Sequence, residues 1–269
     1  MDMTLCTSSG SIKITWDDEQ LNDTLLSLFV SWQVKNGPTP SYHLVIEGKC
    51  RQYHLHTPDG IILCSDEREL FLHLEYRLTG LFQNLFSRNL IIHAACVERN
   101  GNGVLLVGGH GSGKTTLALT AISSGMRALT DDVAILDTDL PQVIGFPRPF
   151  KVNAHTWSMN PQVVPGDCPF IPCSDDITYV FFYKPENRYY TEKARLKVIL
   201  FSIRHEGSTE IQPLGETDAL RRILPQGFNF YMRKETLVGE LLDLFRIAQP
   251  YELLYSDHWD AIAKVNDML

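Results

Sequence analysis

The stretch that decides the fold reads VLLVGGHGSGKTTLALTAI and covers residues 104–122. Its first four residues are apolar and predict a buried strand, and apolar side chains recur at helical spacing after residue 116. Residues 108–115, between them, match G-x-x-x-x-G-K-[ST], the pattern of a phosphate-binding loop. A glycine-rich turn that only joins a strand to a helix is the alternative, and the flanking strand and helix argue against it.

The chemistry of such a loop requires this order of strand, glycines and helix. Glycines let consecutive backbone N–H groups point at phosphate oxygens, and the helix adds the positive end of its dipole. Lys114 is expected to reach the β- and γ-phosphates, and the Thr115 hydroxyl is expected to bind Mg²⁺. We therefore expect a nucleoside triphosphate and Mg²⁺ at this loop. The residues expected to bind the nucleotide are Gly108, Gly109, His110, Gly111, Ser112, Gly113, Lys114, Thr115 and Thr116.

Two adjacent carboxylates, Asp131 and Asp132, follow the loop after one helix and one short strand. Gly125 is a helix stop signal, and residues 126–129 predict the return strand. A right-handed crossover between parallel strands puts the end of that strand on the same sheet edge as the loop. One carboxylate would then hold Mg²⁺ and the other would accept a proton from an attacking hydroxyl. A solvated acidic turn is the alternative.

The composition limits the class of partner. The chain has 269 residues, with 24 Lys plus Arg against 32 Asp plus Glu, so its formal net charge is −8. This charge disfavours broad attraction to nucleic acid or anionic lipid. The amino terminus lacks the character of a signal peptide, and no apolar run approaches the ~18 residues of a membrane span. We expect a cytoplasmic protein with reduced cysteines and with neither a nucleic-acid partner nor a membrane partner.

The sequence predicts an α/β protein of two domains, a small α+β domain over residues 1–88 and a P-loop domain over residues 89–269. In the first domain we expect a strand at 11–16, a helix at 21–32, strands at 42–47, 51–56 and 61–64, and a helix at 67–86. In the second we expect, besides the loop and its flanks, a strand at 90–98, a long ordered loop at 141–172, strands at 178–183 and 196–203, and helices at 217–224 and 233–248.

A resemblance to a known family rests on residues on both sides of the loop. HAACV at 93–97, the phosphate loop, Gly125, the aspartate pair and FPRPF at 146–150 together resemble the catalytic core of the bacterial HPr kinase/phosphorylase family. The resemblance covers about residues 90–152 and implies a P-loop, HPr-kinase-like (PEP-carboxykinase-like) fold for the second domain. Within that superfamily the sequence is most similar to small HPr-kinase-like proteins that phosphorylate a serine of lasso-peptide precursors.

The resemblance implies a serine kinase with ATP and Mg²⁺ as its cofactors and gives roles to particular residues. Lys114 and Thr115 would hold the triphosphate and the metal. Asp131 would be the acid/base carboxylate, and Asp132 would be its neighbour on the metal side. His93 would match the histidine of the strand before the loop, whereas without the resemblance a hydrogen-bonded core histidine is the simpler interpretation.

Two basic features add to this site. Arg148 lies between two prolines that stiffen its loop, so it is expected near the phosphates as a charge clamp. A surface arginine in a turn is the alternative. Residues 184–204 carry six basic and two acidic side chains, and we expect a mobile lid or substrate clamp there, with a solvated hairpin face as the alternative.

The expected acceptor is a serine of a peptide or small protein, of the lasso-precursor type. An acidic residue usually stands in the family where this chain has Gly109, and Ser-Glu where it has Thr115-Thr116, which disfavours HPr as the acceptor. An HPr-type protein kinase/phosphorylase is one alternative, and an ATPase or nucleotide-binding regulator without a phospho-acceptor is another. The resemblance also allows a homo-oligomer, because family members of the HPr type form hexamers.

Overall fold

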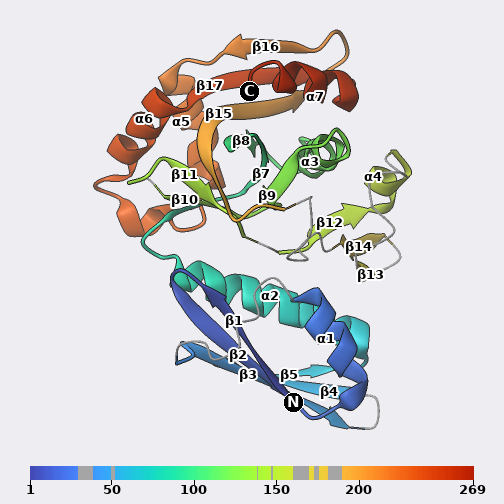
Figure 1. Cartoon of the computed structure of the whole chain (residues 1–269). Coiled ribbons are helices and arrows are strands. Elements are labelled where there is room, and N and C mark those ends of the chain that lie inside the picture. Colours follow the sequence, from blue (N-terminus) through green and yellow to red (C-terminus); the bar gives the residue numbers. More distant parts are fainter. Residues whose placement is uncertain are drawn as a thin grey trace.

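The structure is a computed structural model of the whole chain. Figure 1 shows two units, each with its own sheet, and helix α2 (Glu67–Leu85) lying between them. Phe82 of α2 meets Phe146 of the second unit edge to face, with ring centroids 5.8 Å apart, and both rings are buried. One hydrophobic core therefore continues from the first unit into the second. The structure describes residues 1–29, 39–49, 52–137, 139–146, 148–159, 170–172, 176–180 and 190–269.

The first unit is a five-stranded sheet with helices on one face. Residues along its strands alternate between the two faces, so that Leu5, Ile14 and Leu55 are buried against the helices while their neighbours face solvent. The elements are β1 (Asp2–Thr7), β2 (Gly10–Trp16), a 3-10 turn (Glu19–Leu21), α1 (Asn22–Leu28), β3 (Tyr42–Lys49), β4 (Gln52–Thr57), β5 (Gly60–Cys64) and α2, with the strands in the order β1-β2-β3-β4-β5 and β2 parallel to β3.

The sequence predicted most of this unit. The helix expected at residues 67–86 is confirmed as α2, which begins where the side chain of Asp66 accepts a hydrogen bond from the backbone N–H of Glu69. The strand at the amino terminus, β1, was missed, because only Met3 and Leu5 among its six residues are buried apolar residues. The end expected for the first helix, beyond residue 29, lies outside the described residues.

The second unit contains a nine-stranded mixed sheet, and the expected α/β class is confirmed. β7 is antiparallel to both β8 and β9, so the last two run parallel to each other, as the crossover required. The strands are β6 (Leu90–Ile92), β7 (Ala94–Arg99), β8 (Asn102–Val107), β9 (Arg127–Thr130), β10 (Ala134–Asp137), β11 (Gln142–Ile144), β15 (Lys193–Arg204), β16 (Glu210–Pro213) and β17 (Gln249–Tyr255), in the order β6-β10-β11-β15-β8-β7-β9, with β17 beside β15 and β16 beside β17.

Helices cover both faces of this sheet, as Figure 1 shows. Val104 and Leu106 belong to the core on the side of α3 (Lys114–Ser123) and α7 (His258–Asn266). Leu105 belongs to the core on the side of α5 (Glu216–Ile223) and α6 (Leu237–Ile247). Because both faces are buried, β8 is the continuous apolar run that the sequence shows.

Several expected boundaries in the second unit were wrong. The strand expected at 90–98 is two strands, β6 and β7, which separate at His93. The described part of the loop expected at 141–172 contains β11, β12 (Phe150–Asn153), α4 (Ala154–Met159) and β13 (Phe170–Pro172). β12 and β13 pair with β14 (Ile177–Val180) in a small separate sheet. Beyond residue 248 the chain continues into β17 and α7, which were not expected.

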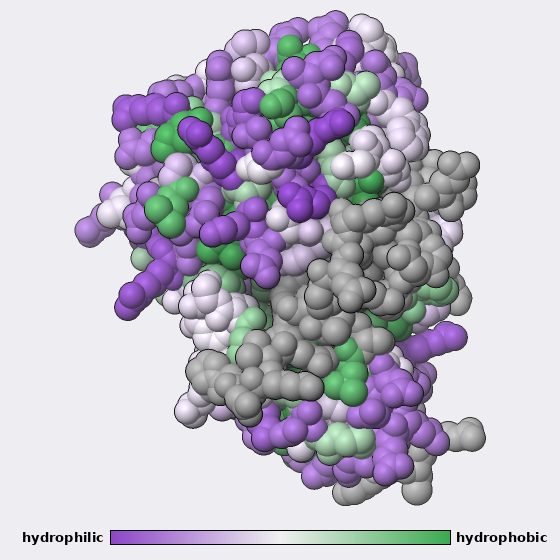
Figure 2. Space-filling view, in the orientation of Figure 1, coloured by the Kyte–Doolittle hydropathy of each residue, from purple (hydrophilic) through white to green (hydrophobic). Residues whose placement is uncertain are grey.

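Hydrophilic and apolar side chains are unevenly represented on the surface of the second unit. On the face drawn in Figure 2, hydrophilic side chains predominate over the second unit and apolar ones are scattered among them. Among the described residues, no helix combines the length and the apolar character that crossing a bilayer demands.

Candidate active site

The phosphate loop has a backbone that only glycine adopts easily at two places. Gly111 and Gly113 have φ of 78° and 86°, in the left-handed region. A Cβ at Gly113 would also overlap the Tyr255 hydroxyl, which donates a hydrogen bond to the Ser112 carbonyl at 2.8 Å. Tyr255 is the last residue of β17, so a strand more than a hundred residues away in the sequence holds the loop through this hydrogen bond. His110 is exposed at the tip of the loop.

Lys114 lies folded over this loop. It is the first residue of α3, its side chain is buried, and its Nζ donates to the carbonyls of Gly108 and Gly109 at 2.9 and 3.2 Å. Burial lowers the pKa of Lys114, while the negative charges of Asp132 and Asp131 oppose that shift. The Lys114 ammonium therefore lies at the loop that precedes α3, where the N–H groups of the first helical turn are also found. Both kinds of group bind phosphate oxygens.

Asp131 is joined to the loop through Thr115. The Thr115 hydroxyl lies 3.0 and 3.3 Å from the two carboxylate oxygens of Asp131, and the backbone N–H of Lys151 donates to one of them at 3.3 Å. Asp131 is completely buried. Its burial and the charge of Asp132 raise the pKa of Asp131 to about 7, against the lowering effect of Arg148. Oxygen donors of this kind suit Mg²⁺.

Asp132 contacts two basic side chains. Its oxygens lie 3.3 Å from His93 Nε2 and 3.5 Å from an Arg148 nitrogen. Burial alone would raise the pKa of Asp132, but the hydrogen bond from His93 and the charge of Arg148 hold it well below its ordinary value. Asp132 also has a φ of 63°, a strained value for a residue with a side chain, and such strain is concentrated at functional sites.

His93 occupies the break between β6 and β7. Its backbone N–H donates to the carbonyl of Gln226 at 2.7 Å, and its ring lies 6.0 Å from the ring of Phe228. The strand is interrupted there because the backbone of this residue pairs outside the sheet. At this break in the strand, the His93 side chain contacts Asp132.

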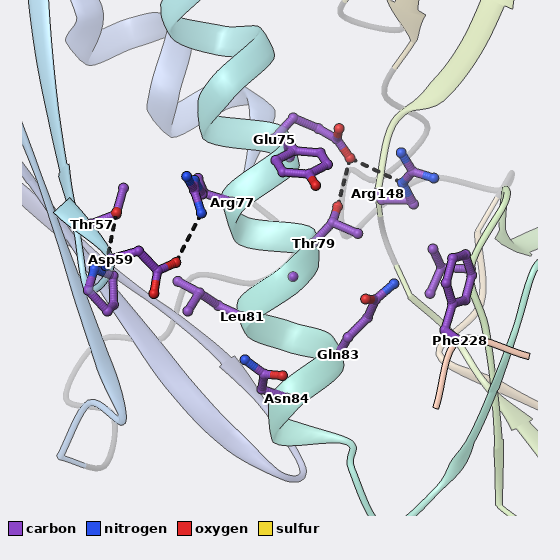
Figure 3. A pocket seen from close by; sticks show the side chains of 14 residues that line it. Thr57, Asp59, Glu75, Arg77, Thr79, Leu81, Gln83, Asn84, Arg148 and Phe228 are labelled. Atoms are coloured by element: carbon purple, nitrogen blue, oxygen red, sulfur yellow. Dashed lines mark hydrogen bonds and ion pairs between the residues drawn. The ribbon is translucent and has the colours of Figure 1, made fainter. Parts of the chain in front are cut away.

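Arg148 connects the aspartate pair to the first unit. Its side chain is 12% exposed and its Nε lies 3.1 Å from an oxygen of Glu75, on α2. It also lies 3.5 Å from the Asp131 carbonyl, besides its contact with Asp132. Figure 3 shows Glu75 and Arg148 pointing toward one another across the junction of the two units. The role expected of Arg148, a clamp on the phosphates, stays a prediction, because its described partners are carboxylates and a carbonyl.

The structure thus brings the phosphate loop, Asp131, Asp132, His93 and Arg148 together, as the sequence predicted. The carboxylate beside Thr115 is Asp131, whereas the sequence placed Asp132 on the metal side. The Thr116 hydroxyl lies 3.5 Å from that of Thr156, and the role expected of Thr116 in nucleotide binding stays a prediction.

Three features of the site were missed or misjudged. Glu75 was missed although it is a charged residue on the buried side of a helix, which is the only signal the sequence offers for it. Tyr255 lies in a strand that was not expected. The lid expected at 184–204 is wrong for residues 193–204, because these form β15, which is hydrogen-bonded within the central sheet. Residues 184–189 lie outside the described residues.

Comparison with known proteins supports the resemblance seen in the sequence. No family model matches the chain. It is 29% identical over 104 residues to HPr kinase/phosphorylase of Shouchella clausii, covering 35% of this chain and 34% of that protein. It is 34% identical over 62 residues to HPr kinase/phosphorylase of Prosthecochloris aestuarii, covering 23% and 18%. The match therefore spans about a third or less of the length of these relatives, and it is a regional similarity to an HPr-kinase-like protein.

Among solved structures, that of the Hpr(Ser) kinase/phosphatase from Coxiella burnetii covers 66% of this chain and 96% of its own, with a TM-score of 0.33 and 12% sequence identity.

Proposed function

We propose that this chain is an ATP-dependent kinase that transfers the γ-phosphoryl group to a serine hydroxyl of a peptide or small protein. The regional similarity to HPr kinase/phosphorylase supports a kinase-like function. The observation that carries the proposal is the contact of Thr115 with Asp131, because it puts a carboxylate pair beside the end of a phosphate loop. Binding alone would need the loop but not an adjacent pair of aspartates with one of them fully buried.

The loop and α3 would hold the nucleotide. The N–H groups at the start of α3 would bind the β- and γ-phosphates. The Lys114 ammonium would bind them as well, and phosphate oxygens would replace the two backbone carbonyls that it contacts in the structure. Thr115 and an oxygen of the aspartate pair would bind Mg²⁺, since both are hard oxygen donors. The metal would supply charge neutralisation on the phosphates.

Asp131 would take the proton of the attacking serine. A base works best when its pKa lies near the working pH, and burial brings the pKa of Asp131 to about 7. Asp132 would stay ionised beside His93 and Arg148 and keep that region anionic. Positioning and charge neutralisation would supply most of the rate, because phosphoryl transfer passes through a loose transition state.

The acceptor we propose is a precursor peptide of the lasso type. A second candidate is HPr itself, which the names of the matched relatives favour. Gly109 and Thr116, where the family usually has acidic residues, argue against HPr as the acceptor. A third outcome, water as the acceptor, would make the chain an ATPase.

The test is incubation of the protein with MgATP and, in separate reactions, serine-containing precursor peptides and HPr, followed by mass spectrometry. We expect a gain of one phosphate on a serine, and we expect Asp131→Asn to abolish it while ATP affinity changes by less than a few-fold. Asp139→Asn, an exposed carboxylate outside the site, is the matched control. Full transfer by Asp131→Asn would remove Asp131 from its role, and hydrolysis without any phosphorylated acceptor would replace the kinase by an ATPase.

A further inference from the structure

A cavity of about 510 Å³ lies where α2 meets the second unit. Figure 3 shows α2 crossing it, with Thr57 and Asp59 of the β4–β5 turn on one side and Arg148 and Phe228 on the other. The volume is within the ~300–1,000 Å³ typical of ligand sites. We call this cavity the α2 groove.

One end of the α2 groove adjoins the reacting groups. Val133 and Arg148 line that end, and Val133 directly follows Asp132 in the chain. Arg148 contacts Asp132, and Phe228, also in the lining, packs against His93. Since the phosphate loop contacts Asp131 through Thr115, the aspartate pair separates the loop from the groove. A phosphate donor on the loop and an acceptor in the groove would approach the pair from two sides.

The floor of the α2 groove contains a glycine that the fold does not require. Gly80 lies inside the 19-residue helix α2 and lines the cavity, and a Cβ there would meet no atom within 4 Å. Glycine weakens a helix interior relative to alanine, so its presence without a packing reason needs another explanation. A missing side chain at this position lets another backbone approach the helix closely.

The walls of the groove suit a neutral, extended peptide. The charged lining residues are paired with one another, Arg77 with Asp59 at 3.0 Å and Arg148 with Glu75 at 3.1 Å, so the described lining has no unpaired charge. Gln83 and Asn84 offer amide groups for hydrogen bonds to a peptide backbone.

The dimensions and the exposed aromatic rings agree with this occupant. Tyr76 is 70% and Phe228 is 43% exposed, and both line the groove. From Tyr76 to Asn84 the helix extends about 12 Å at 1.5 Å per residue. That length accommodates about four extended residues at ~3.3 Å each.

We propose that the α2 groove binds the acceptor peptide in an extended conformation over the few residues around its serine, with the serine at the Arg148 end. The first unit is then the acceptor-recognition module, and α2 is the element that aligns the acceptor with the aspartate pair. This inference rests on the proposed kinase function for the identity of the occupant.

The test fills the groove without touching the catalytic groups. Gly80→Leu puts a side chain over the floor and strengthens the helix, so the variant is expected to fold, which circular dichroism and thermal melting would verify. The matched control is Gly239→Leu, because Gly239 also lies in a helix, α6, with open space at its Cβ. The probe is an array of synthetic 12-residue peptides with a central serine, bound to the full chain in the presence of magnesium and a non-hydrolysable ATP analogue.

We expect wild type and Gly239→Leu to bind the same peptides and Gly80→Leu to bind them at least about tenfold more weakly, with unchanged affinity for the nucleotide analogue. Tyr76→Ala is expected to weaken peptide binding by a smaller factor. Undiminished peptide binding by Gly80→Leu, or no peptide bound by wild type, overturns the groove proposal.

Adding MgATP to the bound peptides separates the two proposals. Peptides that bind in a Gly80-dependent way but gain no phosphate would retain the groove as a peptide site and reject the kinase function. Phosphorylation by Gly80→Leu with an unchanged KM for the peptide would retain the kinase and reject the groove.

Discussion

The two main sheets of this protein differ in how many of their faces are covered and in how they bring residues to the candidate site. Along β4 of the first sheet, buried Tyr53 and Leu55 alternate with more exposed neighbours, and only one face is covered. β8 of the second sheet is buried from residue 103 to residue 107, on both faces. A sheet covered on both sides has its accessible polar groups at the strand ends, where the phosphate loop and Asp131 follow β8 and β9. The one-sided sheet contributes instead through its covering helix, α2, which brings Glu75 to the site.

The largest effect is expected at the strand end of the second sheet. Gly113→Ala should lower the affinity for ATP at least about 100-fold, because the added Cβ meets Tyr255 and the left-handed φ disfavours alanine. Gly109→Ala, where a Cβ meets no atom within 4 Å, should bind nearly as wild type. Isothermal titration calorimetry of both variants checks this. Equal affinities would mean that the loop does not bind phosphates in the conformation described.

The contribution of α2 is tested by removing one charge at the junction. Glu75→Gln removes the negative charge nearest to Arg148, so we expect a loss of about 2 kcal/mol in the free energy of unfolding and a lower kcat. Glu67→Gln, exposed in the first turn of the same helix, is the control. Urea unfolding followed by circular dichroism measures the difference. If both variants unfold alike, the ion pair does not hold the two units together.

The buried aspartate should make stability depend on pH. Folding raises the pKa of Asp131 from 3.8 to about 7, so the folded protein holds a proton that the unfolded chain loses between these values. The contribution of this group to the free energy of unfolding therefore falls as the pH rises from about 4 to about 7 and is constant above that range. The amide introduced by Asp131→Asn would be neutral at every pH.

The melting temperature of Asp131→Asn relative to wild type, without nucleotide or metal, should consequently be several degrees higher at pH 8 than at pH 5, at roughly 2–4 °C per kcal/mol. Asp139→Asn, which replaces an exposed carboxylate, is the matched control. If the difference in melting temperature between Asp131→Asn and wild type is the same at both pH values, Asp131 is not the group that takes up a proton on folding.

The smallest effect is expected on the open face of the first sheet. Leu63 is 69% exposed there, so Leu63→Ala should change the free energy of unfolding by less than about 0.5 kcal/mol and leave transfer unchanged. Leu55→Ala, on the covered face of the neighbouring strand, should cost about 2–5 kcal/mol. Thermal melting compares the two. A large loss in Leu63→Ala would show that this face is covered by something other than solvent.

The sequence predicted those parts of the site that depend on local order along the chain. The glycine pattern of the loop is local, and the aspartate pair follows from the handedness of one crossover. The contact of Glu75 with Arg148 joins residues 73 positions apart in different units, and neither the spacing nor the composition indicates it. The support of the loop by Tyr255 depends in the same way on a distant strand.

The lid was predicted wrongly at residues 193–204 because the prediction rested on the net charge of the segment and not on the alternation of its polar and apolar residues. Lys193, Arg195 and Lys197 are exposed, whereas Ala194 and Leu196 between them are buried. This alternation with a period of two is typical of a strand. The net charge of the segment does not contain this alternation, so it does not indicate a strand. The assignment of residues 1–88 and 89–269 to two domains stays a prediction.

The central claim is that the loop after β8 binds a nucleoside triphosphate through Lys114, with the aspartate pair beside its terminal phosphate. Calorimetric titration of the full chain with ATP and magnesium tests it most directly, with Lys114→Ala and the exposed-site variant Lys193→Ala in parallel. We predict one ATP bound per chain by wild type and by Lys193→Ala, and no measurable binding by Lys114→Ala. Absence of binding by wild type, or equal binding by all three, would contradict the account.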